Sequence, residues 1–222
     1  MAVNDNAPFE ITAFKWVPDF AQGYVRDIRP RWACEEIGLD YSERLIGFDK
    51  PADYFDEQPW GQVPVINDGG IRMFESGAIL LHIAEKDERL MKRDPQSRAT
   101  TLSWVFGAFN SLEPLFFELG NVDIFAKGEQ WAELRRPSLV EFLGQRLDRL
   151  TDALGDRQWL LDDFSVADIA MVTVLRNGGD DPVITSRPSL AAYIERGEAR
   201  PAFQRAMASQ LVPFAKYAPK AA

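Results

Sequence analysis

The sequence predicts an α/β domain over residues 8–88 followed by an all-α domain over residues 95–218. Short β-branched runs occupy the first part, and a turn-forming cluster separates two of them. In the second part, apolar residues recur at helical spacing instead. The segment 86–95 between them is charged and ends in Asp94-Pro95, which is typical of a linker. A chain of 222 residues has ample length for a core, in one large or two small domains.

The first domain is expected to open with a βαβ unit. Residues 10–16 read as one strand, and residues 41–46 alternate well enough for a second. A helix is predicted between them, at about 29–38.

A β-hairpin is expected next. Two short β-branched runs, 63–66 and 71–74, flank Asn67-Asp68-Gly69-Gly70, a cluster that favours a tight turn. The apolar run from 76 to about 87 then predicts a helix. The resulting order, β-α-β followed by β-β-α, is that of a thioredoxin-like domain.

Beyond residue 95 strand signals largely stop, and helices are predicted over 95–120 and 130–154. Two apolar stripes are expected on them: Leu139, Leu143, Leu147 and Leu150 on one, and Leu102, Phe106, Phe109 and 112–116 on the other. A further helix is expected near Ser165, which can cap it while Asp168 reaches back. Phe164 and Ile169 would supply the hydrophobic staple. The second domain is therefore expected to be all-α.

Two dipeptides in the hairpin region carry the functional signal. Pro64 opens a strand, cannot donate to the ladder, and is the residue type that tolerates a cis peptide bond. A cis bond would turn the N–H and C=O of Val63 outward, where they can pair with an extended peptide. Glu75 and Ser76 begin a helix whose N-terminus favours a ligand carboxylate, and Glu75 itself can receive an ammonium. Such a pair of sites suits a small peptide that carries a free α-amino acid end.

Several motifs resemble the glutathione S-transferase family. Gln58–Pro64 (QPWGQVP) and Phe74–Ile79 (FESGAI) resemble its glutathione-binding half, and Arg31–Tyr41 resembles its first helix and second strand. Phe164–Ala170 (FSVADIA) resembles its C-terminal capping motif, and Arg200–Ala206 (RPAFQRA) a common ending of its bacterial members. The matches run along nearly the whole chain in the family's order, which is more specific than any one motif.

The resemblance implies a role for each residue of the two dipeptides. Glu75 and Ser76 would hold the γ-glutamyl group of glutathione, and Val63, ahead of Pro64, would pair with the cysteinyl backbone. Gln62 would contact the peptide further along, or else it is a solvated loop residue. Taken alone, Glu75 and Ser76 also fit an ordinary helix cap without a ligand; after a Val-Pro strand start and a hairpin, they favour the ligand.

The group that activates the thiol is sought in the loop before the first helix. A hydroxyl that donates a hydrogen bond to sulfur favours the thiolate, and the family position for it falls on Tyr24. The loop Val17–Tyr24 is longer than usual and contains no Ser or Cys, so Tyr24 could instead be a packing aromatic. Arg26 would add positive potential near the helix start, or form a surface ion pair. Asp27 is expected to be the N-cap of that helix.

Two other reactive residue types are interpreted as structural. Cys34 lies inside the predicted first helix and is expected to be a buried, inert small hydrophobe. His82 lies on an apolar helical stripe with Ile79 and Ile83 and is expected to be a satisfied core or interdomain residue.

Composition excludes several classes of function. A net charge of −9 argues against nucleic acid or an anionic membrane as partner. No apolar run approaches the roughly 20 residues needed to span a bilayer, and residues 1–10 lack the features of a signal peptide. One Cys and one His provide no recognisable zinc site, and a single Cys fits a reducing cytoplasm.

The sequence therefore predicts a cytoplasmic glutathione transferase, with glutathione as co-substrate and no metal. By resemblance it would be a homodimer that acts on hydrophobic electrophiles in an aromatic, apolar pocket near Trp16 and Phe20. The first helix of the second domain would line that pocket and carries Phe106, Phe109, Asn110, Phe116 and Phe117; most of these phenylalanines must be core, and one or two would face the cleft. Two alternatives stay open. The same thiolate site could serve glutathione-dependent isomerisation or peroxide reduction, or the fold could be a non-catalytic binding module.

Overall fold

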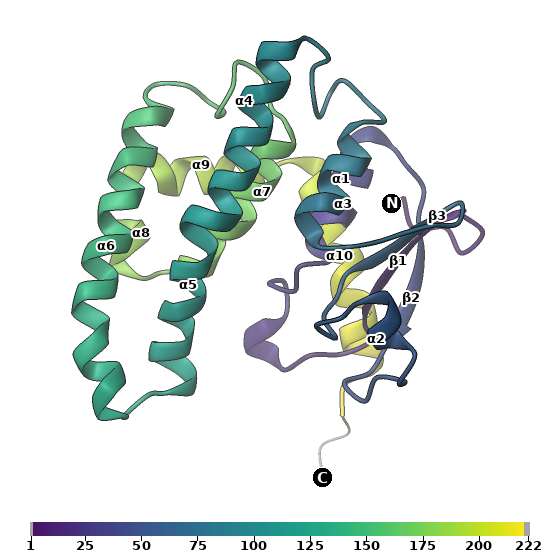
Figure 1. The fold of residues 1–222 in the computed structure, drawn as a ribbon, viewed down its shortest axis with the longest axis horizontal. Coiled ribbons are helices and arrows are strands. Elements are labelled where there is room, and N and C mark those ends of the chain that lie inside the picture. Colours follow the sequence, from purple (N-terminus) through teal and green to yellow (C-terminus); the bar gives the residue numbers. More distant parts are fainter. Residues whose placement is uncertain (1, 220–222) are drawn as a thin grey trace. The chain divides into compact units, whose positions relative to one another are not determined.

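A mixed sheet of four strands forms the centre of one of two units in the computed structural model, which describes residues 2–219 (Figure 1). The strands are β1 (Phe9–Phe14), β2 (Ser42–Ile46), β3 (Val65–Asp68) and β4 (Ile71–Phe74), in the order β2-β1-β3-β4. β1 pairs in parallel with β2 and antiparallel with β3, and β3 and β4 form the predicted hairpin. This topology confirms the thioredoxin-like fold predicted for the first part of the chain.

The helices of this unit are α1 (Ile28–Ile37), α2 (Tyr54–Glu57), α3 (Ser76–Ala84) and, from the end of the chain, α10 (Pro201–Lys216), with a short 3₁₀ turn at Asp19–Ala21. α1 joins the parallel strands β1 and β2, and α3 follows the hairpin, as the sequence predicts. The four residues of α2 are too few to produce a recognisable helical period, so no sequence signal predicted them.

The chain divides into two compact units that are not continuous in sequence. One contains the chain up to Leu90 together with the segment from Ala199 onward, and the other is Met91–Glu198. In the first unit, α10 packs against α1. The rings of Trp32 and Phe203 meet edge to face at 4.9 Å between centroids. The end of the chain thus completes the unit that the beginning starts.

Ion pairs also join α1 to α10 within the first unit. Arg200 binds Glu36 at 2.6 Å, and Arg205 binds Glu35 at 2.6 Å. The Trp32 indole also donates to Glu36, at 2.8 Å. The charged residues at the end of α1 are thereby paired with the start of α10, while the apolar ring contact lies on the same pair of helices.

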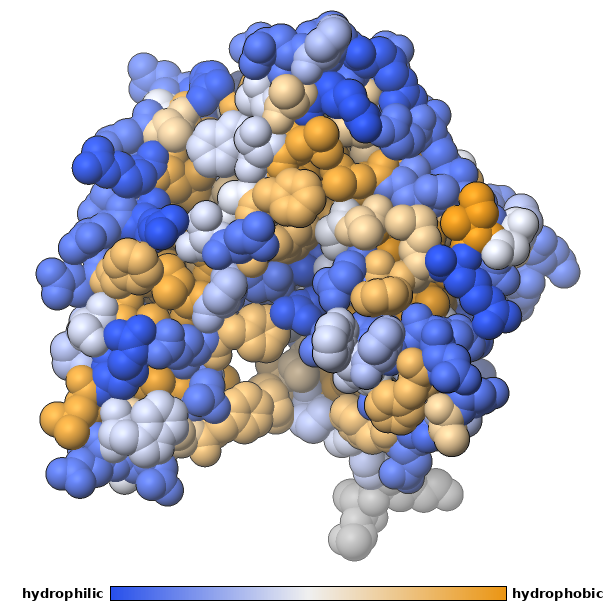
Figure 2. Space-filling view, viewed as in Figure 1, coloured by the Kyte–Doolittle hydropathy of each residue, from blue (hydrophilic) through white to orange (hydrophobic). Residues whose placement is uncertain are grey.

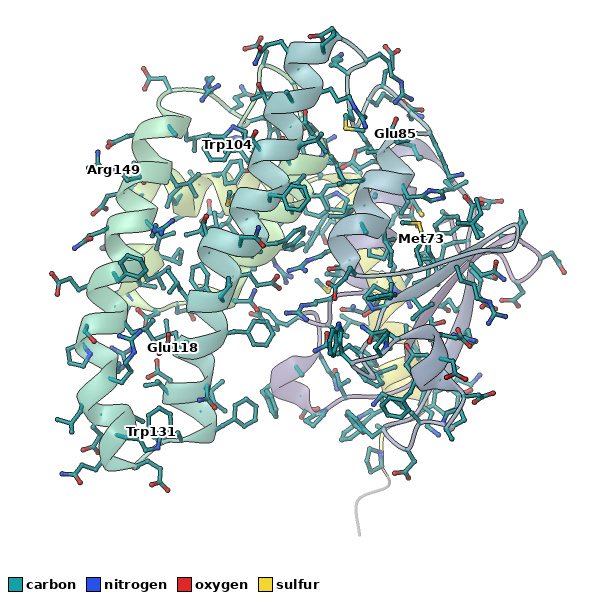
Figure 3. All side chains as sticks on the ribbon, in the orientation of Figure 1. Met73, Glu85, Trp104, Glu118, Trp131 and Arg149 are labelled. Carbon is teal, nitrogen blue, oxygen red and sulfur yellow. The ribbon has the colours of Figure 1, made fainter. Side chains whose placement is uncertain are left out.

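The second unit contains only helices among its described residues, which confirms the predicted all-α region. They are α4 (Pro95–Phe106), the π-helical η2 (Gly107–Leu112), α5 (Glu113–Gly120), the π-helical η3 (Asn121–Phe125), α6 (Gln130–Leu154), α7 (Val166–Leu175), the 3₁₀ turn η4 (Arg176–Gly178), α8 (Pro182–Thr185) and α9 (Pro188–Glu198). α5 and α6 are tied by an ion pair at 2.6 Å between Arg135 and Glu118, the latter labelled in Figure 3.

One of the two predicted apolar stripes is confirmed, and the other is partly wrong. The four leucines of α6 are all buried: Leu139, Leu143, Leu147 and Leu150. On α4 and η2 the buried positions lie one residue earlier than expected, at Thr101, Val105 and Ala108, whereas Phe106 is 54% exposed. α4 packs against α7, every residue of which is buried. The predicted stripe is shifted by one residue on α4 and at the start of η2 but is correct at Leu112 and Phe116, which are buried.

The capping box at the start of α7 is confirmed. Ser165 Oγ accepts from the Ala167 N–H, and Asp168 Oδ2 accepts from the Ser165 N–H at 2.9 Å. Asp168 has no solvent exposure, and its Oδ1 also accepts from the Leu160 N–H at 2.9 Å and the Tyr193 hydroxyl at 2.8 Å. The carboxylate therefore ties the helix start to the segment before it and to α9.

On the face shown in Figure 2, apolar and hydrophilic side chains are intermixed. Over residues 2–219, no helix combines the length and the apolar character that crossing a bilayer requires.

Replacing Asp168 by alanine should destabilise the protein by about 1.5–5 kcal/mol. The estimate adds the loss of a helix cap, about 0.5–2 kcal/mol, to that of buried donors left without an acceptor, about 1–3 kcal/mol. Thermal melting and urea denaturation would measure it. Asp94→Ala removes the N-cap contact to the Ser97 N–H at an exposed helix start and is the matched control, with a much smaller loss expected. Equal losses for both variants would contradict the central role of Asp168.

Candidate functional site

In the segment that leads into β3, the backbone N–H and C=O of Val63 are available to a ligand. The Val63–Pro64 peptide bond is cis, and neither the N–H nor the C=O of Val63 bonds to any residue from 2 to 219. The Tyr54 hydroxyl donates to the carbonyl oxygen of Gln62 at 2.7 Å. Burial raises the pKa of Tyr54 to about 12, so this hydroxyl keeps its proton at neutral pH. The segment is thus held in place and offers one donor and one acceptor to an extended ligand.

The side chain of Gln62 turns toward the loop before α1. Arg26 Nη1 donates to Gln62 Oε1 at 3.3 Å. Gly61 has a φ of +63°, and a Cβ at that position would lie 2.8 Å from a ring carbon of Phe55. Only glycine fits this combination of backbone angle and close approach. The structure therefore brings the predicted residues Arg26 and Gln62 into contact.

The two predicted dipeptides emerge from the same end of the hairpin. Val65 and Phe74 are paired across β3 and β4. Val63-Pro64 directly precedes Val65, and Glu75 directly follows Phe74. The free backbone groups of Val63 and the start of α3 are therefore neighbours, as the sequence motifs imply.

Glu75 has an unusual backbone. Its φ of +66° makes it the sole non-glycine residue with a positive φ in the part of the chain that the structure describes. Such a conformation costs about 1–3 kcal/mol and is found most often at functional sites. The carboxylate is exposed and makes no capping hydrogen bond to α3. The interpretation of Glu75 as an ordinary cap is not supported, because the N–H groups of the first turn of α3 are left to other partners.

Ser76 is buried and bonded to an arginine that the sequence analysis missed. Arg29 Nη1 donates to Ser76 Oγ at 2.8 Å, and the two residues are 2% and 6% exposed. A guanidinium beside the N-terminus of α3 adds positive charge where the helix dipole already favours an anion. One signal was available: Arg29 and Arg31 lie early in α1, where the dipole disfavours cations, so another interaction must compensate for them.

The loop before α1 carries Tyr24 and Arg26 on one turn. The Tyr24 N–H donates to the Ala21 carbonyl at 3.1 Å, and the Ile28 N–H donates to the Val25 carbonyl at 3.1 Å. The side chain of Tyr24 is 45% exposed. Both candidates for thiol activation are therefore placed by a turn that leads directly into α1.

The expectation that Asp27 caps α1 is wrong. Asp27 occupies the N-cap position, but its backbone is already helical and its side chain makes no capping bond. Its carboxylate is buried and accepts from Arg31 Nε at 2.7 Å and from Gln210 Nε2 at 2.7 Å. Burial raises the pKa of Asp27, and the charge of Arg31 opposes that effect. A partner one helical turn away, Arg31, and a partner far along the chain, Gln210, outcompete the local cap.

Cys34 and His82 lie outside this constellation. Cys34 is fully buried in α1, and burial raises the pKa of its thiol well above the usual range, which agrees with an inert role. His82 is not a core residue: it is half-buried, and its Nε2 lies 2.7 Å from Asp68 Oδ2. Lys86 binds the same oxygen at 2.6 Å. Asp68 ends β3, at the opposite end of the strand from Pro64.

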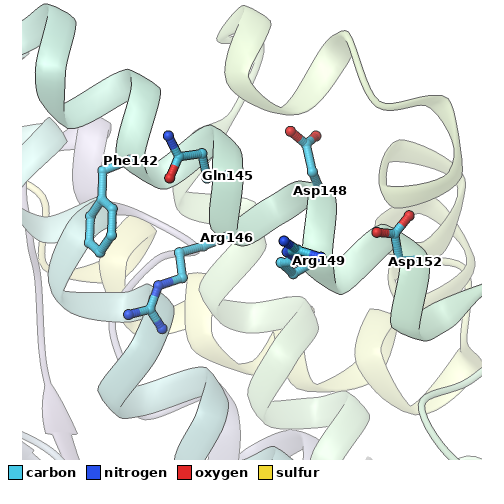
Figure 4. Close-up of a pocket in the computed structure, with 6 residues that line it drawn as sticks. All are labelled: Phe142, Gln145, Arg146, Asp148, Arg149 and Asp152. Carbon is cyan, nitrogen blue, oxygen red and sulfur yellow. The ribbon is translucent and has the colours of Figure 1, made fainter.

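A shallow pocket elsewhere contains none of the predicted site residues. It lies on one face of α6 and is lined by Phe142, Gln145, Arg146, Asp148, Arg149 and Asp152 (Figure 4). The Arg146 guanidinium lies 5.0 Å from the centre of the Phe142 ring. Within residues 2–219, no cluster of His, Cys, Asp and Glu is arranged to hold a metal ion.

Known proteins are similar to this chain over most of its length. The model of the glutathione S-transferase N-terminal domain matches residues 21–85, which include Tyr24, Val63 and Ser76. The disulfide-bond oxidoreductase YfcG of Escherichia coli is 30% identical over 190 residues, which are 78% of this chain and 86% of that protein. Glutathione S-transferase F14 of Arabidopsis thaliana is 28% identical over 190 residues, 78% of this chain and 75% of that protein.

Solved structures of bacterial glutathione transferases share the fold. One from Burkholderia graminis, with two glutathione molecules bound per subunit, has a TM-score of 0.80 and 27% identity. The alignment covers 90% of this chain and 88% of that one. One from Pseudomonas putida, with one glutathione disulfide bound per subunit, has a TM-score of 0.78 and 26% identity, and the alignment covers 90% of each chain.

Proposed function

The chain belongs to the glutathione S-transferase family and is a glutathione-dependent transferase, and we propose that it joins the glutathione thiolate to hydrophobic electrophiles. The observation that carries the proposal is the unpaired backbone of Val63 beside the start of α3. A free N–H and C=O next to an anion-favouring helix N-terminus match the cysteinyl backbone and the γ-glutamyl carboxylate of glutathione.

In this proposal each polar group of the site has a partner on glutathione. Val63, ahead of the cis Pro64, pairs with the cysteinyl N–H and C=O. The N-terminus of α3, Ser76 and the positive charge of Arg29 hold the γ-glutamyl carboxylate, and Glu75 receives the α-ammonium. Gln62, which already contacts Arg26, contacts the peptide further along.

The chemistry then requires that the glutathione thiol lose its proton. The turn with Tyr24 and Arg26 supplies a phenol that can donate to the sulfur and a cation that lowers the thiol pKa. The thiolate attacks an electrophilic carbon, a carbon–sulfur bond forms, and the leaving group departs or the added electron pair is protonated. Phe20 and Tyr24, 60% and 45% exposed, give the turn the aromatic character that an apolar electrophile prefers.

Three wider features belong to the same proposal. Segment 8–88 would bind glutathione, and the second domain, expected at 95–218, would end at Glu198 because the chain from Ala199 onward belongs to the first unit. The enzyme would be a cytoplasmic homodimer, as its family resemblance implies. Tyr24 and Arg26 would be the activating groups.

A second candidate is the reduction of disulfides by glutathione. It is favoured by the 30% identity to a disulfide-bond oxidoreductase and by the glutathione disulfide in the Pseudomonas putida structure. Because the one cysteine of the sequence, Cys34, is buried, both electrons would come from glutathione. Two molecules of glutathione would give one glutathione disulfide and two substrate thiols.

Paired activity assays would separate the two functions. Conjugation is followed with a chloronitrobenzene, whose product absorbs light. Disulfide reduction is followed with a small organic disulfide, by measuring the glutathione disulfide formed. We expect turnover in the first assay, since the thiolate site faces aromatic side chains. Turnover in the second assay alone would replace the proposed activity by the reductase, and the absence of both together with absence of glutathione binding would overturn the proposal.

Removing the carboxylate of Glu75 should weaken glutathione binding by about 1–3 kcal/mol, or roughly 5- to 150-fold, the scale of a lost charge-assisted hydrogen bond. Calorimetry with Glu75→Ala and Glu75→Gly would measure it. Both variants lack the carboxylate and should lose the same affinity. Glu75→Gly should melt at the higher temperature, because glycine accepts a positive φ more readily. An exposed carboxylate elsewhere, removed in Asp5→Ala, should leave affinity unchanged; affinity that survives in the Glu75 variants would show that the ammonium binds elsewhere.

The activating group can be identified from the thiol pKa of bound glutathione. Tyr24→Phe keeps the ring and removes only the donor, so binding should persist while the thiol pKa and the pH–rate profile move upward. Arg26→Ala tests the electrostatic contribution in the same way. Ultraviolet titration of bound glutathione measures both variants, and Cys34→Ala should titrate like the parent. If Tyr24→Phe also titrates like the parent and Arg26→Ala does not, the arginine is the activator.

A further inference from the structure

A glutamine of the last helix reaches the turn that carries the proposed thiol-activating groups. Gln210 lies on α10, has no solvent exposure, and belongs to the same compact unit as α1. Its Nε2 donates to the Val25 carbonyl at 3.0 Å and to Asp27 Oδ1 at 2.7 Å. Because both partners are acceptors, the nitrogen of the amide must face the turn.

These two bonds hold the turn at two residues, Val25 and Asp27. The Val25 carbonyl also accepts from the Ile28 N–H, the bond that turns the chain into α1. The other oxygen of Asp27 is bound by Arg31 Nε, so the carboxylate is held from two sides. Arg26 lies between the two acceptors, and Tyr24 immediately precedes them. A displacement of this turn relative to α10 would break both bonds of Gln210.

The arrangement is poorly explained by stability alone. The Oε1 of Gln210 is buried and has no hydrogen-bond partner among the described residues. A buried amide with an unpaired oxygen is unfavourable, and an apolar side chain of similar volume would fill the same space without that penalty. The two bonds donated to the turn are what the amide contributes that an apolar residue could not.

We propose that Gln210 is a positioning residue that fixes the Tyr24–Asp27 turn, and with it the groups that activate the glutathione thiol. The inference rests on the proposed function for its consequence in catalysis, but its structural part concerns the turn itself. Under this proposal, Gln210 contacts neither glutathione nor the electrophile. It acts through the main chain of Val25 and the side chain of Asp27.

Ser209→Ala provides a matched control on the same helix. Ser209 belongs to the same buried network, through Arg31 Nη1 at 3.3 Å and the Tyr41 hydroxyl at 2.9 Å, but it makes no bond to the turn. The test variant is Gln210→Leu, which keeps the volume and removes both donors. Gln210→Asn is tested in parallel, because its amide is too short to reach both acceptors and its smaller change protects against a failure to fold.

Two measurements on the full-length protein decide the proposal. Hydrogen exchange of unliganded protein, followed in peptides that cover the turn, should be faster in the Gln210 variants and unchanged in Ser209→Ala. In the glutathione complex, the Gln210 variants should raise the thiol pKa, shift the pH–rate profile upward and lower kcat/KM roughly tenfold, as misplaced catalytic groups do. Both kinds of variant should lower the melting temperature.

The outcomes separate the inference from the proposed function. If the Gln210 variants exchange and titrate like Ser209→Ala, with only a lower melting temperature, the role of Gln210 is structural and the inference is overturned. If the parent protein does not bind glutathione, the proposed function fails. In that case faster exchange at the turn in the Gln210 variants would still support the part of the inference that concerns the turn.

Discussion

The buried charge of Arg31 is the constraint on which the first unit is built. A guanidinium without solvent contact must be paired, and its partners come from three directions. Asp27 binds it from the start of α1, Glu43 of β2 lies 2.5 Å away, and Ser209 of α10 is bonded at 3.3 Å. These contacts tie α1 to the sheet and to the last helix, while the buried Arg31 Nη2 has no hydrogen-bond partner among the described residues. The Tyr24–Asp27 turn shares one carboxylate with this network, because Asp27 binds both Arg31 and Gln210.

The parts of the fold that depend on local rules could be predicted from the sequence. The β3–β4 hairpin follows from a turn cluster between two β-branched runs, and the start of α7 follows from a capping box with Asp168. The buried face of α4 could not be predicted in the same way. Its buried residues, Thr101 and Val105, face α7, and which face of a helix meets its partner is decided by tertiary packing that a stripe of large apolar residues does not record. Phe106 was predicted to be buried because it is large and apolar, but it is exposed in the structure.

In the candidate site, too, the features set by local sequence could be predicted and those set by tertiary packing could not. The Val63-Pro64 and Glu75-Ser76 motifs are contiguous, so sequence spacing could place them together at one end of the hairpin. Partners that meet only through tertiary structure were missed or misinterpreted. Arg29 reaches Ser76 across 47 residues of sequence. The buried Gln210 reaches Asp27 across 183, so that Asp27 gives up the expected helix cap for Gln210 and for Arg31 one turn along α1. A local cap competes poorly with a buried charge, because an unpaired charge carries the larger penalty.

The return of α10 to the first unit has a consequence for synthesis of the chain. Domains usually fold as they leave the ribosome, with N-terminal regions first. Here the nascent chain through Leu90 contains the sheet, α1 and α3, but it lacks Phe203, Ser209 and Gln210. Arg31 already has Asp27 and Glu43 at that stage, but its contact with Ser209 and the contact of Trp32 with Phe203 must wait while all of Met91–Glu198 is translated. The helical unit, whose residues are contiguous, is complete before the unit that precedes it.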